Sequence, residues 1–279
     1  MKSSYYKYFA ALLLFGSNGI VASNINLPSY EIVLLRLLLG SLFLITVFTV
    51  SRQRFTFYRN KHTCLYLFIS ASAMGASWML LYEAYQQVGI SIASLAYYCG
   101  PVIVMILSPF LFRETLTWPK IAGFLTVLAG MCLVNLQALD EGKTIWGLFC
   151  GLMSAFMYAL MVTANKKAKP ESGLENSLLQ LVIGSFIVVA FVSMQKNFVL
   201  SLTTIDWIPV LLLGLLNTGI GCYLYFSSIT DLPVQTVAIC GYLEPLSAVV
   251  FSVLFLHEVL LPLQMLGAVL ILGGAIFGE

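Results

Sequence analysis

Residues 96–130 read AYYCGPVIVMILSPFLFRETLTWPKIAGFLTVLAG, and residues 240–274 read CGYLEPLSAVVFSVLFLHEVLLPLQMLGAVLILGG. The two stretches align without a gap at a constant shift of 144, and the alignment extends back to residues 75 and 219. The same shift pairs Glu31, Gly40 and Ser41 with Glu175, Gly184 and Ser185. Matches of Gly, Pro and Glu in register are informative in an apolar chain, in which Leu matches are not. The chain is therefore a tandem duplication. The most informative pairs are Tyr98/Tyr242, Pro101/Pro245, Glu114/Glu258, Gly123/Gly267 and Gly130/Gly274.

The composition excludes an ordinary soluble domain. Hydrophobic residues make up 60% of the chain and charged residues 9%, and the mean hydropathy is +0.94, whereas soluble domains carry about 25% charge. A bilayer core needs about 20 apolar residues per helix, and spans in lipid must satisfy their own backbone groups. We expect ten transmembrane helices, at about 5–24, 28–50, 63–88, 91–112, 117–136, 142–165, 172–194, 205–229, 232–256 and 261–277.

Lys and Arg gather on one side of these spans, which the positive-inside rule assigns to the cytoplasm. The other side carries only Lys143 and Lys196, and Arg36 lies within a span. Both termini should then be cytoplasmic, and the first span, which lacks a cleavage site, should be a retained helix. Five helices per repeat is an odd number, so the second half must be inverted. The sequence predicts an all-α polytopic protein of the cytoplasmic membrane, built from two inverted five-helix repeats, residues 1–138 and 139–279.

Motifs for enzymatic chemistry are missing from the sequence. There is no G-x-S-x-G, no H-E-x-x-H and no G-x-x-x-x-G-K-[ST],. The six cysteines lack the spacing of a metal site or disulfide framework, and we expect buried thiols,. We therefore predict no enzyme, no metal and no cofactor. Inverted repeats are instead the architecture of secondary transporters, in which rocking of the halves alternates access to a central site.

A family resemblance rests on the repeated signature Phe112-Arg113-Glu114-Thr115-Leu116 with Gly123 and Gly130. Its second copy is Leu256-His257-Glu258-Val259-Leu260 with Gly267 and Gly274. Phe15-Gly16-Ser17-Asn18, Leu34-Leu35-Arg36-Leu37 and Glu244-Pro245 match as well. The chain resembles the EamA-type members of the drug/metabolite transporter superfamily over nearly its whole length. The resemblance implies proton-coupled or gradient-driven movement of amino acids or other small metabolites. Gln180 replaces the counterpart of Arg36, so this arginine occurs only once.

Glu244 lies near the middle of its predicted span, where a carboxylate costs about 2.5–3.5 kcal/mol on insertion scales,. Pro245 follows it, and Gly100-Pro101 is the repeat counterpart. We expect kinks at Gly100, Pro101 and Pro245, with the residue before proline pushed away from helical geometry. Glu244 is predicted to carry protons or to bind a cationic group; the alternative is a structural acid with a buried partner.

Arg36 is too deep in its span to reach water, so it either holds a substrate carboxylate or locks helices through Glu244 or backbone carbonyls. Trp78, Tyr82, Tyr85 and Gln86 recur at helical spacing, and these rings with Glu83 could bind an ammonium group through cation–π attraction,. The alternative is an interfacial aromatic belt. Other polar side chains on predicted inner helices are expected to bind substrate or to bond between helices. These are Asn18, Tyr97, Tyr98, Tyr158, Asn217, Tyr223 and Tyr242.

Several repeated residues suggest structural roles. Glu114 and Glu258 sit at span ends and are expected to cap helices or pair with loops. Glu175 follows Ser172 at the spacing of a capping box, and Glu31 stands in the matching place,. The glycine pairs seven residues apart at 123/130 and 267/274 should let helices approach closely,.

The sequence thus predicts a secondary transporter that moves an amino acid or related zwitterion by alternating access. One alternative is a proton-antiport exporter of organic cations, in which Glu83 and Glu244 compete for proton and drug. Another is a membrane enzyme or scaffold that transports nothing. The expected partners are a small-molecule substrate and the lipid bilayer, without nucleic acid; assembly into a homodimer is left open.

Overall fold

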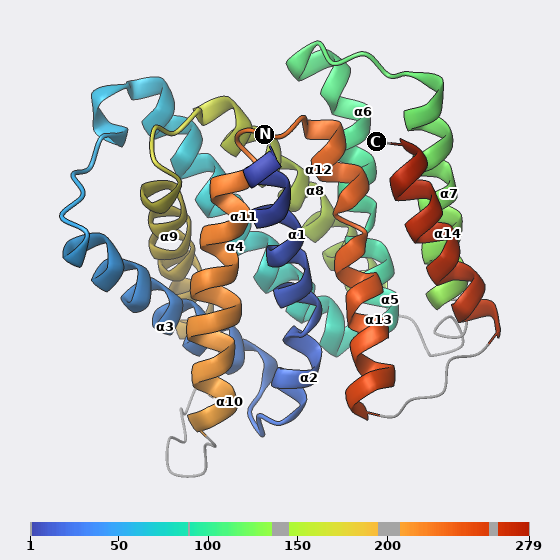
Figure 1. Ribbon diagram of the computed structural model, residues 1–279. Coiled ribbons are helices and arrows are strands. Elements are labelled where there is room, and N and C mark those ends of the chain that lie inside the picture. Colours follow the sequence, from blue (N-terminus) through green and yellow to red (C-terminus); the bar gives the residue numbers. More distant parts are fainter. Residues whose placement is uncertain (1, 89, 136–144, 195–206, 257–261, 279) are drawn as a thin grey trace.

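The computed structural model describes residues 2–88, 90–135, 145–194, 207–256 and 262–278. In this part of the chain the helices form one bundle and no strand occurs (Figure 1). The α-helices are α1 (Lys2–Gly16), α2 (Asn18–Ser23), α3 (Ser29–Val50), α4 (Lys61–Val88), α5 (Ile90–Tyr97), α6 (Cys99–Phe112), α7 (Trp118–Asn135), α8 (Ile145–Ala168), α9 (Gly173–Ser193), α10 (Trp207–Leu211), α11 (Gly221–Ser228), α12 (Val234–Cys240), α13 (Leu243–Leu256) and α14 (Pro262–Gly278). A 3₁₀ turn, η1 (Phe57–Arg59), precedes α4, and a π-helix, η4 (Leu212–Ile220), joins α10 to α11.

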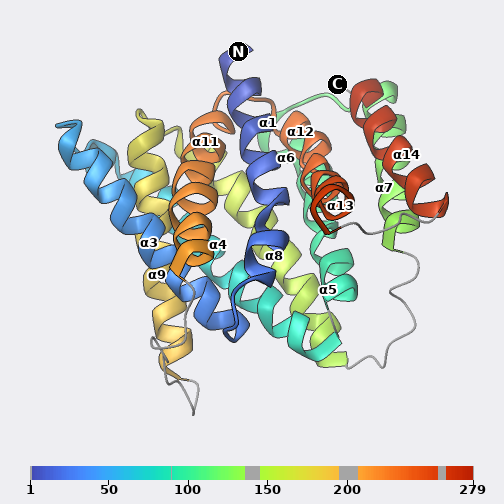
Figure 2. The same cartoon turned by 60° about the horizontal axis from the view of Figure 1, so that its bottom comes forward.

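Six helical stretches are long and apolar enough to cross a membrane, and three shorter apolar helices accompany them. Large apolar side chains such as Phe110, Phe186 and Ile276 are exposed on the outside of the bundle, as expected where lipid replaces water. Helix α1 begins and α14 ends at the same end of the bundle, which we call the terminal end (Figures 1 and 2). The protein is therefore an all-helical, multi-pass membrane protein, whereas the count of ten crossings and the cytoplasmic side of the termini stay predictions.

The helices break before the predicted hinge residues and not at them. Tyr98 separates α5 from α6, and Gly241 with Tyr242 separates α12 from α13. Pro101 and Pro245 are consequently the third residues of their helices, where a missing N–H has no intrahelical acceptor to lose,. The expected kinks at Gly100, Pro101 and Pro245 are corrected to these earlier positions, and Glu244 stays helical because it lies within the same first turn.

Contacts between the two halves follow the sequence repeat. Helix α3 packs on α9 and α7 packs on α14, and each pair joins repeat-related stretches. The hydroxyls of Ser41 and Ser185 lie 3.0 Å apart, and the Tyr242 hydroxyl donates to the Tyr98 carbonyl at 2.7 Å, so both bonds join residues 144 positions apart. The two halves of the chain therefore contact each other through equivalent positions.

The crossing of α7 and α14 depends on glycine. A Cβ on Gly123 would lie 2.6 Å from the Gly274 carbonyl oxygen, and one on Gly130 would lie 2.6 Å from that of Gly267. Such contacts are shorter than real Cβ atoms show, so the backbones touch. This confirms the prediction that the glycine pairs allow close helix approach.

Glu114 joins the two halves of the chain at the terminal end. The carboxylate of Glu114 accepts hydrogen bonds from the backbone N–H groups of Val234 and Gln235 at 2.8 and 3.1 Å, which caps α12. Capping by Glu114 is thereby confirmed, and it acts across the two halves of the chain. Its counterpart Glu258 lies outside the described residues.

The capping box at α9 is only half formed. The Ser172 hydroxyl accepts the backbone N–H of Glu175 at 3.4 Å, as predicted. The Glu175 carboxylate instead accepts from the Thr56 hydroxyl and from the N–H groups of Thr56 and Phe57, at 2.5–3.0 Å. It therefore caps η1.

The expectation of buried thiols holds for three cysteines, but Cys132 is exposed on α7, where it faces away from the core.

Candidate functional site

A cavity of about 560 Å³ lies among eight helices, α1, α2, α3, α4, α5, α8, α11 and α13. Figure 2 shows how these helices are arranged, with the bottom of the bundle turned forward. Small-molecule sites commonly have 300–1,000 Å³, so the space suits a small metabolite. Its lining reaches exposed residues Gly19 and Ser23 at the end of α2, opposite the terminal end. Nine of its lining residues are aromatic. They are Phe15, Trp78, Tyr82, Tyr85, Tyr97, Tyr98, Tyr158, Tyr225 and Phe226.

Glu244 is one of two charged residues among the described lining residues. It is the second residue of α13 and lies just past the break after α12. The start of a helix carries a partial positive charge from its unpaired N–H groups. This partial charge favours a carboxylate at that position, and Glu244 faces the cavity, where a ligand can reach it,.

Arg36 is the other charged lining residue, and it is buried in the middle of α3. Its Nε donates to the Thr218 hydroxyl at 2.8 Å, and its guanidinium carbon lies 4.7 Å from the centre of the Trp78 ring. Among the described residues no ion pair within 4.0 Å joins Arg36 to Glu244. The alternative in which Arg36 joins helices by bonding to Glu244 is therefore wrong. The Arg36 side chain instead bonds to the Thr218 hydroxyl and stacks on the Trp78 indole.

The position equivalent to Arg36 in the second half has a different environment. At a shift of 144, Arg36 corresponds to Gln180 and Trp78 corresponds to Cys222. Gln180 is fully buried, accepts from the Ser70 hydroxyl at 3.2 Å and donates to Asn176 at 3.5 Å. The second half therefore uses this position for helix packing, and the first half uses it to place a charge in the cavity.

The π-helix supports the arginine. The Thr218 hydroxyl that binds Arg36 also donates to the Leu213 carbonyl, five residues back, at 2.8 Å. Next to it, the Asn217 amide lies 2.8–3.0 Å from the Leu14 carbonyl, the Ser17 hydroxyl and the Asn18 amide oxygen. Isolated π segments often occur at functional sites. Here the segment joins the break between α1 and α2 to the guanidinium.

Most of the predicted site residues come together in the cavity. Those that line it are Asn18, Arg36, Trp78, Tyr82, Tyr97, Tyr98, Tyr158 and Glu244. The remaining four, Glu83, Asn217, Tyr223 and Tyr242, do not line it. Asn217 and Tyr242 make the helix-joining bonds given above.

Glu83 and Tyr223 face other neighbours. The Glu83 carboxylate accepts from Gln87 at 3.1 Å and from the Trp146 indole at 3.4 Å, near the end of α4. The Tyr223 ring lies under the Lys7 ammonium group at 5.9 Å. A role for these two in substrate binding has no support from the geometry of this cavity.

The prediction omitted several lining residues, notably Phe15, Ser94, Tyr225 and Phe226, whereas Tyr85 was expected on the aromatic face of α4 and does line the cavity. Tyr85 shares the helical face of Trp78 and Tyr82, so helical spacing alone indicates it. Tyr225 was less accessible to prediction, because Tyr223 and Tyr225 point to opposite sides of α11 and only packing fixes which side faces inward. The Tyr225 hydroxyl lies 3.3 Å from that of Tyr158 across the cavity wall.

Comparison with known proteins assigns the architecture. The sequence profile of the EamA-like transporter family matches residues 3–136 and again residues 145–277. The chain belongs to the EamA-like transporter family. It therefore lies within the drug/metabolite transporter superfamily, and the curated relatives reported below are named as transporters or exporters.

Individual relatives of this EamA-like transporter agree with the assignment. The uncharacterized transporter YxxF of Bacillus subtilis is 27% identical over 275 residues, which cover 96% of this chain and 86% of YxxF. The threonine/homoserine exporter RhtA of Escherichia coli is 28% identical over 233 residues, which cover 83% of this chain and 75% of RhtA. A crystal structure of another protein, 18% identical, superposes with a TM-score of 0.84 over 99% of this chain and 96% of its own. The fold is therefore shared with that structure.

Proposed function

We propose that this EamA-like protein is a secondary active transporter for an amino acid or related zwitterion in the cytoplasmic membrane. The observation that carries the proposal is the pair of opposite charges, Arg36 and Glu244, in one aromatic cavity without an ion pair between them. A zwitterion supplies one carboxylate and one ammonium group, which match these two charges. The relationship to RhtA, a threonine/homoserine exporter, points to the same substrate class.

Alternating access is part of the proposal. The bonds between residues 144 positions apart favour two inverted halves that exchange about an axis,. Among the described lining residues, exposed ones occur only at the α2 side, whereas the terminal end is closed by side-chain bonds. There the Tyr8 hydroxyl donates to the Val237 carbonyl at 2.7 Å, and the Lys166 ammonium donates to the Thr230 carbonyl at 2.7 Å and to that of Leu232. With cytoplasmic termini, this is an outward-facing state.

The direct test is substrate flux into proteoliposomes. Purified protein is challenged with amino acids, polyamines and quaternary ammonium compounds, with and without a pH gradient. Current and radiolabel counterflow are both recorded, because electroneutral exchange gives no current. Saturable counterflow of one amino acid supports the proposal. Folded protein that gives neither signal for any amino acid would refute it.

The organic-cation exporter remains the second candidate, because the aromatic wall suits cation–π binding,. Substitution of Arg36 distinguishes the zwitterion transporter from the cation exporter. Arg36→Lys keeps the charge but loses the flat group that stacks on Trp78 and can bind a carboxylate through two bonds,. We expect zwitterion transport to fall about tenfold, the effect of losing roughly 1.4 kcal/mol. Transport of a fixed cation that survives Arg36→Ala unchanged would instead favour the exporter.

The cap that Glu114 forms on α12 should control access from the terminal end. Glu114→Ala removes both bonds to the α12 backbone, and each hydrogen bond to a charged group is worth about 1.5–3 kcal/mol. The population open at this end should therefore rise about tenfold or more. Labelling of Val237→Cys, in a background without native cysteines, by an impermeant maleimide reports this opening. Glu171→Ala, which changes an exposed acid near the same end, is the matched control; equal labelling in both variants would exclude the cap as a gate.

A further inference from the structure

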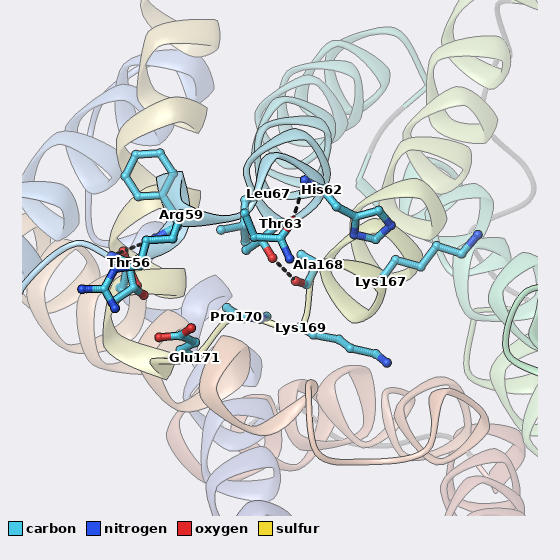
Figure 3. Close-up of a pocket in the computed structure, with 13 residues that line it drawn as sticks. Thr56, Arg59, His62, Thr63, Leu67, Lys167, Ala168, Lys169, Pro170 and Glu171 are labelled. Atoms are coloured by element: carbon cyan, nitrogen blue, oxygen red, sulfur yellow. Dashed lines mark hydrogen bonds between the residues drawn. The ribbon is translucent and has the colours of Figure 1, made fainter.

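A second cavity, of about 350 Å³, lies near the terminal end between η1, the start of α4 and the end of α8 (Figure 3). It is separate from the transport cavity, with which it shares no lining residue. In the picture, His62 and Lys167 extend on one side, Arg59 and Thr56 lie on the other, and Lys169 to Glu171 run below them. The Thr63 hydroxyl joins α4 to α8 by donating to the Ala168 carbonyl at 2.9 Å.

Cations predominate around this cavity. Arg59, Lys167 and Lys169 line it together with His62. Lys167 lies 6.0 Å above the Tyr66 ring, and Lys169 adopts a left-handed backbone with φ of 48° directly after α8. Among the described residues, none of these three cations forms an ion pair within 4.0 Å. Their charges are therefore open to an anion from outside the chain.

The two acidic residues of the cavity, Glu171 and Glu175, offset only part of the charge of its three cations. Glu175, at its base, is 1% exposed, and its two oxygens are occupied by Thr56 and Phe57. Glu171 is exposed at the rim. A phosphate group is bound best by charge-assisted donors, and the Arg59 guanidinium and the Lys169 ammonium group line this cavity together with the side-chain amide of Asn60.

We propose that this cavity binds the phosphate of an anionic phospholipid headgroup from the adjacent leaflet. The cavity lies where α4 begins and α8 ends, both helices being long enough to cross a membrane, so headgroups lie at this level. Basic pockets at the ends of transmembrane helices commonly hold such headgroups. A soluble phosphate shares the same chemistry, and the test separates the two sources.

The test is native mass spectrometry of the full-length, delipidated protein. It is titrated with phosphatidylglycerol or with phosphatidylcholine of the same acyl chains. The test variant Arg59→Gln/Lys169→Asn removes two charges and keeps a residue that tolerates positive φ at 169. The control Lys2→Gln/Arg113→Asn removes two charges at the same end, one of them also at positive φ, outside the cavity.

The wild-type protein should prefer phosphatidylglycerol, and the test variant, which lacks two cations, should bind it about thirtyfold more weakly. The control should bind as the wild type does. Equal affinity for both lipids, or equal weakening in test and control, would overturn the proposal. So would saturable binding of inorganic phosphate without lipid preference, since it would assign the site to a soluble anion. If the double variant does not fold, Lys167→Gln is measured in its place, and unchanged lipid preference there counts equally against the site.

Discussion

Glu244→Gln should abolish gradient-driven transport while the protein still folds. The substitution keeps the size of the side chain and the start of α13 but removes the negative charge of the cavity. A hydrogen bond to a charged group is worth about 1.5–3 kcal/mol, so transport efficiency should fall about 10- to 100-fold even without proton coupling. If Glu244 also carries the proton, accumulation against a gradient should vanish altogether. Substrate counterflow and pH-driven uptake, measured side by side, separate the two losses.

The matched control is Glu83→Gln. Glu83 is a carboxylate on α4 that bonds to Gln87 and Trp146 and does not line the cavity. Its replacement should leave transport near the wild-type value. If Glu244→Gln transports as the wild type does, the assignment of Glu244 fails. If Glu83→Gln loses transport as well, the cation-exporter alternative, in which both acids take part, gains support.

Replacement of two neighbouring glycines of α14 by alanine should change the free energy of unfolding in opposite directions. A Cβ on Gly274 would lie 2.6 Å from the Gly123 carbonyl oxygen and 2.9 Å from the Val127 backbone nitrogen, whereas one on Gly273 would meet nothing within 4 Å. Overpacking costs typically about 1–3 kcal/mol, so Gly274→Ala should lower the free energy of unfolding by that amount. Gly273→Ala should raise it slightly, because alanine stabilises a helix by roughly 0.5–1 kcal/mol relative to glycine.

Unfolding by sodium dodecyl sulfate in mixed micelles measures both variants under one condition. The two substitutions add the same methyl group to the same helix, so helix propensity differs little between them, and only the methyl group at 274 enters the contact with α7. Equal stability of Gly274→Ala and Gly273→Ala would show that α7 and α14 separate easily, in conflict with the close approach of their backbones. A third variant, Gly130→Ala, should resemble Gly274→Ala, since its Cβ would meet the Gly267 carbonyl at the same distance.

Helix positions and helix packing were predictable to different degrees. Long apolar runs admit only one kind of local structure in lipid, so the residue ranges of the helices follow closely from hydropathy. The breaks were predicted two to four residues late, because proline marks the first turn of the following helix and not the break itself,. The π-helix at Leu212–Ile220 was not predicted, and its side chains Thr218 and Asn217 join it to Arg36 in α3 and to the Leu14 carbonyl in α1.

The sequence by itself determined a duplicated, all-helical membrane protein of a transporter family, with Arg36 and Glu244 as its unusual charges. Periodicity, composition and the shift of 144 are properties of the chain order, and they need no contacts to be visible. Only the tertiary structure decided which face of each helix lines the cavity, so that Tyr225 enters it and Tyr223 does not. The tertiary structure also decided that Arg36 bonds to the Thr218 hydroxyl and stacks on the Trp78 ring. It likewise decided that the Glu175 carboxylate accepts hydrogen bonds from Thr56 and Phe57. These partners lie far apart in the chain, and side-chain bonds between distant segments form only where packing brings their helices within a few ångströms.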